Sequence, residues 1–177
     1  VSIMVMDGVY TEDVTITRSN VALRGHAKSL HQKSVRVNGT ITVNHNGGSG
    51  PLNEVVTITG FTITPASGHA IEFIGTGSGS LVLDDVLAIG NGGSALIVTN
   101  NPATKDSRIR IESCQLTSQG DFPAADIQYG TLYTAVDGDM TAKTSSGTAP
   151  ALKLSNEAAV YMDRFVVSSG GTTIQCT

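Results

Sequence analysis

The sequence predicts an all-β protein, a parallel β-helix of about seven coils with little or no helix. Three observations lead to this prediction. The composition favours strands, apolar and polar residues alternate in short stretches, and those stretches return at intervals of 20 to 28 residues. We expect residues 1–177 to form a single β-helix domain, which is a segment of a longer chain or a unit of an assembly, because 177 residues suffice for one core.

The composition is unusual for a globular enzyme. Tryptophan is absent, aromatic residues make up 5% of the chain and charged residues 15%, while glycine occurs 20 times. Together with many valine and isoleucine residues, this favours strands and turns over helices. The net charge of −4 gives no support for nucleic-acid binding, and no apolar run is long enough to cross a membrane. We therefore expect neither nucleic acid nor a membrane as a partner.

The alternation is clearest in residues 55–64, VVTITGFTIT. Apolar side chains stand at Val56, Ile58, Phe61 and Ile63, and Gly60 divides the stretch into two short strands. A period of two is typical of strands with one buried face. The same shape returns in three later stretches, which are residues 80–89, 107–116 and 158–167.

These stretches align into two columns of apolar residues, one on each side of the kink. The column before the kink comprises Ile16, Val37, Ile58, Leu83, Ile111, Val136 and Met162. The column after it comprises Val21, Ile41, Phe61, Val86, Cys114, Met140 and Phe165. Further strands are expected at residues 69–73, 94–98, 125–129, 150–154 and 172–176.

A solenoid explains this recurrence best. Two or three short strands in every 20 to 28 residues are typical of stacked repeats. The leucine-rich repeat consensus is absent, and a propeller blade needs about four strands in roughly 40 residues. A β-sandwich could supply evenly spaced strands, but it would not bring the same short motif back in register. In a parallel β-helix each coil stacks on the one before it, so like positions form columns.

Four carboxylates directly follow the first column in successive coils: Asp84, Glu112, Asp137 and Asp163. Stacked like charges repel one another unless water, a bound cation or basic neighbours such as Arg110 and Arg164 offset the repulsion. Acid groups two coils apart would stand about 9–10 Å apart, near the upper limit for inverting glycosidases. Neighbouring carboxylates could instead bind Ca²⁺. We favour a third interpretation, a hydrated turn position that suits Asp and Asn, and expect no catalytic residue, metal or cofactor.

The beginning of the chain, DGVYTEDVTITRSNVALRGHAKS at residues 7–29, resembles the opening coils of right-handed β-helix proteins with the pectin-lyase-like fold. The resemblance implies a right-handed helix. That superfamily includes pectate lyases, polygalacturonases, alginate epimerases, bacteriophage tailspikes and virion proteins, so the fold alone selects no function. The residues that carry the likeness are Gly8, Val9, Tyr10, Glu12, the stretches VTI and NVALRG, and later residues 55–64 and 67–73.

The catalytic motifs of polygalacturonases do not transfer to this chain. That family carries an Asp-Asp pair before a Gly-His-Gly motif, whereas here SGHA (residues 67–70) precedes LDD (residues 83–85). The residue after His69 is Ala70 rather than glycine, and RIRI (residues 108–111) is only a distant match to an Arg-Ile-Lys motif. No catalytic role is carried across.

We therefore expect a structural module of a virion, a bacteriophage tailspike or fibre segment or a capsid decoration protein, that acts as a rigid shaft. By analogy with the resembled family, its partners would be other virion subunits in a homo-oligomer, a trimer, with cell-surface polysaccharide as a further partner. Two alternatives stay open. One is a polysaccharide lyase or glycoside hydrolase, and the other is a carbohydrate-binding adhesin module that is extracellular or on a bacterial surface.

Overall fold

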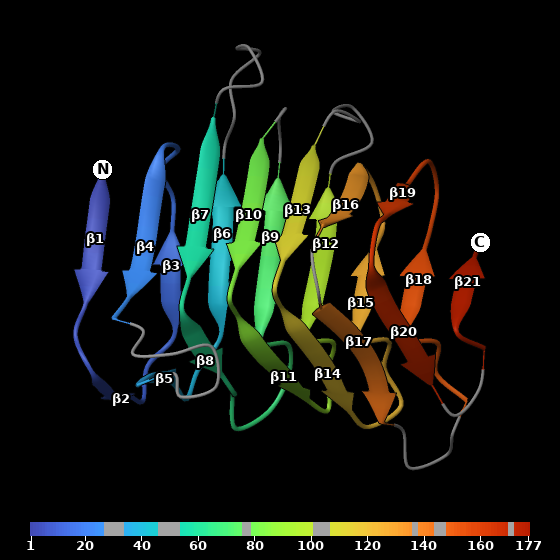
Figure 1. The fold of residues 1–177 in the computed structure, drawn as a ribbon, viewed down its shortest axis with the longest axis horizontal. Coiled ribbons are helices and arrows are strands. Elements are labelled where there is room, and N and C mark those ends of the chain that lie inside the picture. The colour runs from blue at the N-terminus through green and yellow to red at the C-terminus, as the bar shows by residue number, and fades with distance from the viewer. Residues whose placement is uncertain are drawn as a thin grey trace.

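The computed structural model describes residues 1–26, 34–45, 54–75, 79–100, 107–135, 138–143, 148–169 and 172–177. Short strands joined by turns make up these residues, and none of them is helical (Figure 1). Within these ranges, therefore, no helix is long and apolar enough to span a membrane.

The chain passes through three parallel sheets in turn, so that every third strand joins the same sheet. Sheet A comprises β1 (Ser2–Val5), β4 (Val21–Gly25), β7 (Val55–Thr59), β10 (Ser80–Asp84), β13 (Arg108–Glu112), β16 (Thr131–Ala135) and β19 (Ala159–Met162). Sheet B comprises β2 (Gly8–Tyr10), β5 (Val35–Val37), β8 (Phe61–Ile63), β11 (Leu87–Asn91), β14 (Gln115–Gln119), β17 (Gly138–Lys143) and β20 (Phe165–Ser169). Sheet C comprises β3 (Val14–Ile16), β6 (Ile41–His45), β9 (Ile71–Gly75), β12 (Leu96–Asn100), β15 (Ala125–Ile127), β18 (Leu152–Leu154) and β21 (Ile174–Cys176).

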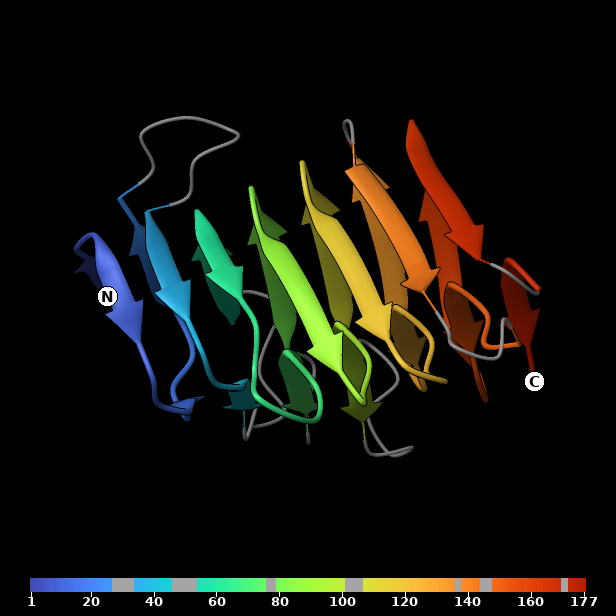
Figure 2. The ribbon, with the colours of Figure 1, turned by 90° about the horizontal axis from the view of Figure 1, so that it is seen from below.

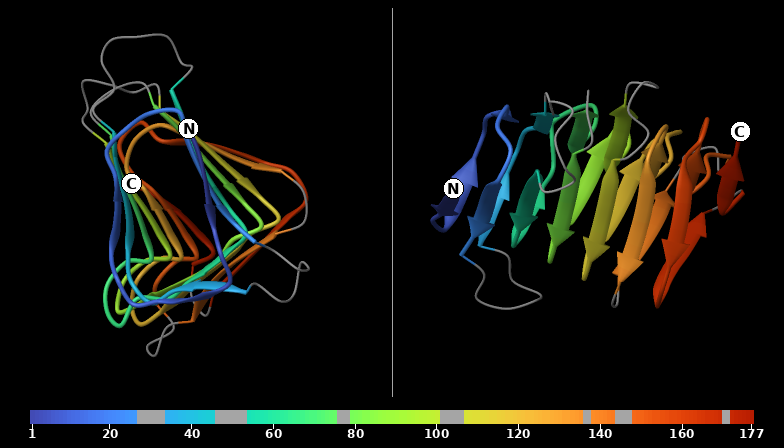
Figure 3. Two further views of the ribbon diagram at one scale, coloured as in Figure 1. Left: turned by 90° about the vertical axis from the view of Figure 1, so that its left-hand side faces the viewer. Right: turned by 90° about the horizontal axis from the view of Figure 1, so that it is seen from above.

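This topology is a parallel β-helix, as the sequence predicted. One coil is one passage through the three sheets, so that β1, β2 and β3 form the first coil, and each sheet holds seven strands. Strands of consecutive coils lie side by side along the shaft (Figure 2). Viewed along the axis, the chain has a three-sided outline (Figure 3).

Inward side chains of the three sheets fill one continuous core. Leu81 and Leu83 of β10 are fully buried, whereas Val82 between them is partly exposed. In the ladder, Leu83 lies between Ile58 and Ile111 of the adjacent coils. Burying one such side chain stabilises the fold by about 1.5–3 kcal/mol, and the ladder partners of Leu83 belong to other coils. The coils therefore stabilise one another.

Single residues with positive φ turn the chain from sheet A into sheet B. Gly60 (φ 79°), Asp85 (φ 51°), Ser113 (φ 49°) and Arg164 (φ 48°) occupy this corner in four of the coils. The Gly60 N–H donates to the Asp84 carbonyl (3.2 Å), and the Asp85 N–H donates to the Glu112 carbonyl (3.0 Å). The kink that the sequence shows at Gly60 is thus the corner between two sheets, and backbone hydrogen bonds continue through it from coil to coil.

The structure confirms the further strands expected between the kinked stretches, which are β9, β12, β15, β18 and β21. It corrects the alignment of the first two coils. Val21 begins a strand of sheet A, where its partner is Val56, and Ile41 belongs to sheet C, where its partner is Ile71. All three strands of a coil carry the same short alternation, so the pattern identified the strands but not the sheet that each one joins.

Truncating one inward and one outward side chain of β10 tests this register. We expect Leu83→Ala to lower the free energy of unfolding by about 2–5 kcal/mol, because it leaves a cavity between two coils. Val82→Ala, one residue away on the outer face, should cost less than about 1 kcal/mol. Urea denaturation followed by circular dichroism measures both. Equal losses in the two variants would contradict the assigned register.

Candidate functional site

The carboxylates that the sequence places in one column do not form a continuous ladder. Asp84 and Glu112 do lie directly opposite each other, at the ends of β10 and β13. The next residue in register is Ala135, at the end of β16. The expected alignment of Asp137 was therefore wrong, since Ala135 holds that position, and Asp137 itself lies outside the described residues. The prediction placed Val136 beside Ile111, whereas in the structure the partner of Ile111 is Thr134.

Arginine side chains accompany two of these carboxylates, as the sequence suggested. Arg110 forms an ion pair with Glu112 through its Nε and the Oε1 of the carboxylate, and the Glu112 side chain is 25% exposed. Asp163 follows β19 and is 74% exposed, with its Oδ2 3.9 Å from Nε of Arg164. Water screens charges as exposed as Asp163, so an ion pair there adds little to stability.

A cation site would need more ligands than this position supplies. Ca²⁺ takes six to eight oxygen ligands, several of them from carboxylates. Asp84 and Glu112 are adjacent, but Ala135 follows them in the column. Across the described ranges, no three His, Cys, Asp or Glu side chains are grouped so that they could hold a metal ion.

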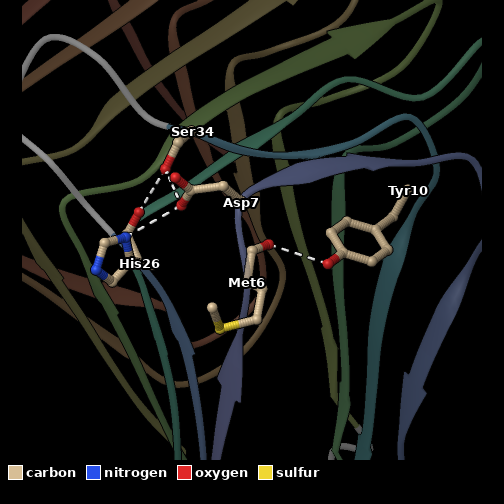
Figure 4. A network of polar contacts seen from close by, with 5 residues as sticks. All are labelled: Met6, Asp7, Tyr10, His26 and Ser34. Carbon is tan, nitrogen blue, oxygen red and sulfur yellow. Dashed lines mark hydrogen bonds and ion pairs between the residues drawn. The ribbon is translucent and has the colours of Figure 1, made fainter.

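A second polar cluster, Asp7 with His26 and Ser34, joins the first two coils (Figure 4). The Ser34 hydroxyl lies 2.6 Å from Oδ1 of Asp7 and 2.5 Å from the His26 carbonyl oxygen, so both oxygens compete for its proton. Nδ1 of His26 lies 3.1 Å from the same Oδ1. Beside this cluster, the Tyr10 hydroxyl donates to the carbonyl of Met6 at 3.0 Å.

These three residue types also make up the triad of serine hydrolases, but their geometry here is different. In a triad, one nitrogen of the histidine accepts the serine proton while the aspartate holds the other nitrogen. In this cluster the serine hydroxyl faces Asp7 rather than a nitrogen of His26. The contacts therefore tie two coils together and do not activate Ser34 as a nucleophile. Sequence spacing gave no sign of this cluster, because its members come from different positions in unequal coils.

Among the acidic side chains whose burial the structure describes, Asp126 is the buried one, at 9% exposure. It lies in β15, where Oδ2 is 3.8 Å from Nζ of Lys153 in the neighbouring strand β18. No donor among the described residues reaches its Oδ1. Burial raises the pKa of Asp126 above its ordinary value of 3.8, and Lys153, Gln128 and His69 lower it in part.

The ring of His69 is held in place near this carboxyl. Its Nδ1 accepts the backbone N–H of Ser94 at 2.9 Å, which leaves Nε2 to carry the proton in the neutral ring. The Phe122 ring meets it edge-on, with centroids 6.4 Å apart and an interplanar angle of 85°. The sequence places His69 before one strand and Phe122 before another, so only the stacking of coils brings the two rings together.

The chain matches no protein-family model, no curated protein and no solved structure. The pectin-lyase-like resemblance of residues 7–29 is therefore a likeness of pattern, and function has to be argued from the fold and from these side chains.

We expect millimolar Ca²⁺ to change the melting temperature by less than about 1 °C, because Asp84 and Glu112 supply too few ligands. If a site did exist, Ca²⁺ at 100 times its dissociation constant would raise the free energy of unfolding by about 2.7 kcal/mol, which raises the melting temperature by several degrees. Differential scanning fluorimetry with Ca²⁺, and with Mg²⁺ as the control, measures the shift. A rise in melting temperature that is specific to Ca²⁺ and that Glu112→Gln abolishes would show that this position does bind a cation.

Replacing the shared acceptor tests the Asp7 cluster. We expect Asp7→Ala to lower the free energy of unfolding by about 1 kcal/mol, because the contacts with Ser34 and His26 are both lost. Asp7→Asn keeps one acceptor oxygen and should cost less. Urea denaturation measures both variants, and hydrogen exchange at Gly8, whose N–H donates to the Ser34 carbonyl at 3.0 Å, shows whether the loss is local. If Asp7→Ala leaves the free energy of unfolding unchanged, the cluster does not stabilise the contact between the first two coils.

Proposed function

We propose that this chain is the rigid β-helical shaft of a virion protein, a segment of a bacteriophage tailspike or fibre or a capsid decoration protein. The observation that carries the proposal is the continuous stack of three parallel sheets, with seven strands in each, around one core. The virion assignment is supported by the resemblance of residues 7–29 to the pectin-lyase-like superfamily, which includes tailspikes and virion proteins.

The stack suits a mechanical role. Six steps between seven strands, at about 4.8 Å each, give a shaft on the order of 30 Å long. Hydrogen bonds run along the shaft within the sheets, so bending or stretching it strains three rows of them at once. The corners add further bonds of the same direction, such as Gln115 N–H to the Val86 carbonyl at 2.9 Å.

Exposed apolar side chains gather at the two ends of the shaft. Between the ends, Ile74 and Phe122 are the only large apolar side chains that are exposed among those whose burial the structure describes. Apolar side chains grouped in this way are typical of surfaces that contact further protein. They support the proposal that the shaft works inside an assembly, for which a homotrimer is our choice by analogy. The end residues concerned are Val1, Ile3, Met4, Met6 and Val9 at one end and Tyr161, Met162, Val166 and Ile174 at the other.

Size-exclusion chromatography with light scattering, read beside far-ultraviolet circular dichroism, tests the assembly. We expect a β-rich homo-oligomer, because the apolar side chains at the ends would otherwise remain in water. A double variant, Met4→Lys with Val166→Lys, should weaken the oligomer without changing the spectrum. Lys substitution of Thr57, on the outer face of the central coils, is the matched control. A monodisperse β-rich monomer would contradict the assembly.

Immunogold electron microscopy tests the virion assignment separately. Antibodies raised against the purified chain should label virus particles released by cells that carry its gene. The label should lie at a constant position on each particle. Pre-absorption with the purified chain is the control. Label confined to cells or to their surface would overturn the virion assignment in favour of the adhesin alternative, and it would leave the shaft fold untouched.

A further inference from the structure

Asp126 occupies a position that normally faces water. It lies between Ile97 and Lys153 in the outward column of sheet C, whose earlier members are Thr42 and Glu72. Glu72 is partly exposed, and its Oε2 lies 3.5 Å from the Thr42 hydroxyl. Asp126 in the same column is 9% exposed. One carboxyl of this outer face has therefore lost most of its contact with water, while another two strands away has kept it.

The contacts of Asp126, which include a hydrogen bond with the Gln128 side chain, replace the lost water only in part. Nζ of Lys153, the directly opposed residue in β18, is 3.8 Å from Oδ2, beyond hydrogen-bond distance. Oδ1 is buried and receives no hydrogen bond from any described residue. An ionised carboxylate in such surroundings is destabilised, whereas a neutral carboxyl keeps most of its stability.

We propose that Asp126 and Lys153 form a pH-operated lock between the fifth and sixth coils, one that holds the coils more tightly when the Asp126 carboxyl carries its proton. Protonation removes the buried charge. Ionisation leaves that charge with the Lys153 ammonium at 3.8 Å and the Gln128 side chain as its nearest partners, and further relief requires Lys153 to move inward or water to enter between β15 and β18. This proposal does not depend on the virion role.

The direction of the effect follows from linkage. Burial is the largest influence on Asp126 and raises its pKa above 3.8, so the folded chain keeps a proton that the unfolded chain releases. The stabilisation is therefore complete in acid and is lost as the pH rises through the raised pKa. The other groups facing the carboxyl are Lys153 from β18, His69 from the turn before β9 and Gln128 after β15, and each favours the ionised form without reversing the shift.

The backbone between these coils gives a local readout. The Ser155 N–H donates to the Ile127 carbonyl at 3.0 Å, and the Ala125 N–H donates to the Ala151 carbonyl at 3.0 Å. Both bonds flank the pairing of Asp126 with Lys153. When the lock loosens, these amides should exchange with solvent faster, while amides of β6 and β9 at the other end of sheet C should not respond.

Hydrogen–deuterium exchange of the whole chain between pH 4 and 8, corrected for intrinsic exchange, tests the lock. In the wild type we expect protection of β15 and β18 to fall by up to about tenfold for each pH unit until Asp126 is ionised. Asp126→Asn cannot ionise, so its protection should be independent of pH. Glu72→Gln, the matched carboxyl of the same column, should behave as the wild type. Lys153→Met removes the counter-charge and should shift the fall to higher pH.

Identical pH profiles for the wild type and Asp126→Asn would overturn the proposal. Should that variant not fold, a carbon-13 NMR titration of the wild-type aspartate carboxyls decides the matter. A resonance of Asp126 that titrates clearly above the exposed aspartates is the expected result, and titration with them or below them would overturn the lock. Lys153→Met in the Asp126→Asn background should have no pH-dependent effect.

Discussion

Every part of this chain depends on the parallel register between one coil and the next. Leu83 can be buried only because Ile58 and Ile111 stand above and below it. By contrast, Ile3 and Ile174, inward residues of the end strands, have such a neighbour on one side and stay exposed. No coil encloses a core of its own, so the fold is stable only as a stack. The register also fixes which outward residues become neighbours, and through them the polar contacts of the surface.

The sequence predicted this architecture well because the inner faces repeat one simple rule, an apolar residue at every second position. It predicted the sheets of the first coils less well. The strands around Val21 and Ile41 carry the same alternation as those around Phe61, and nothing in a pattern of period two distinguishes the three sides of a coil. The shift between Thr134 and Val136 arose in the same way, since both residues fit a short strand followed by a turn.

Outward side chains were predicted less well, for a physical reason. Their surroundings depend on which coils are neighbours and on how far the corners reach over the sheet. The pairing of Asp84 with Glu112 followed from the alignment, but the burial of Asp126 and the contact of Asp7 with Ser34 did not. The spacing of 27 residues between Asp7 and Ser34 reflects the length of one coil, and coil lengths differ along the chain.

The unequal corners have a consequence for how such a shaft can change. One residue links β7 to β8 and two link β10 to β11, whereas seven lie between β8 and β9, four between β11 and β12 and five between β14 and β15. The corner from sheet A to sheet B in the second coil holds nine residues, between Gly25 and Val35. Links at both corners therefore vary in length, while the strands that flank them keep their register. Segments of new sequence added between strands, one per coil, would stand in a row along the shaft at intervals close to the strand spacing.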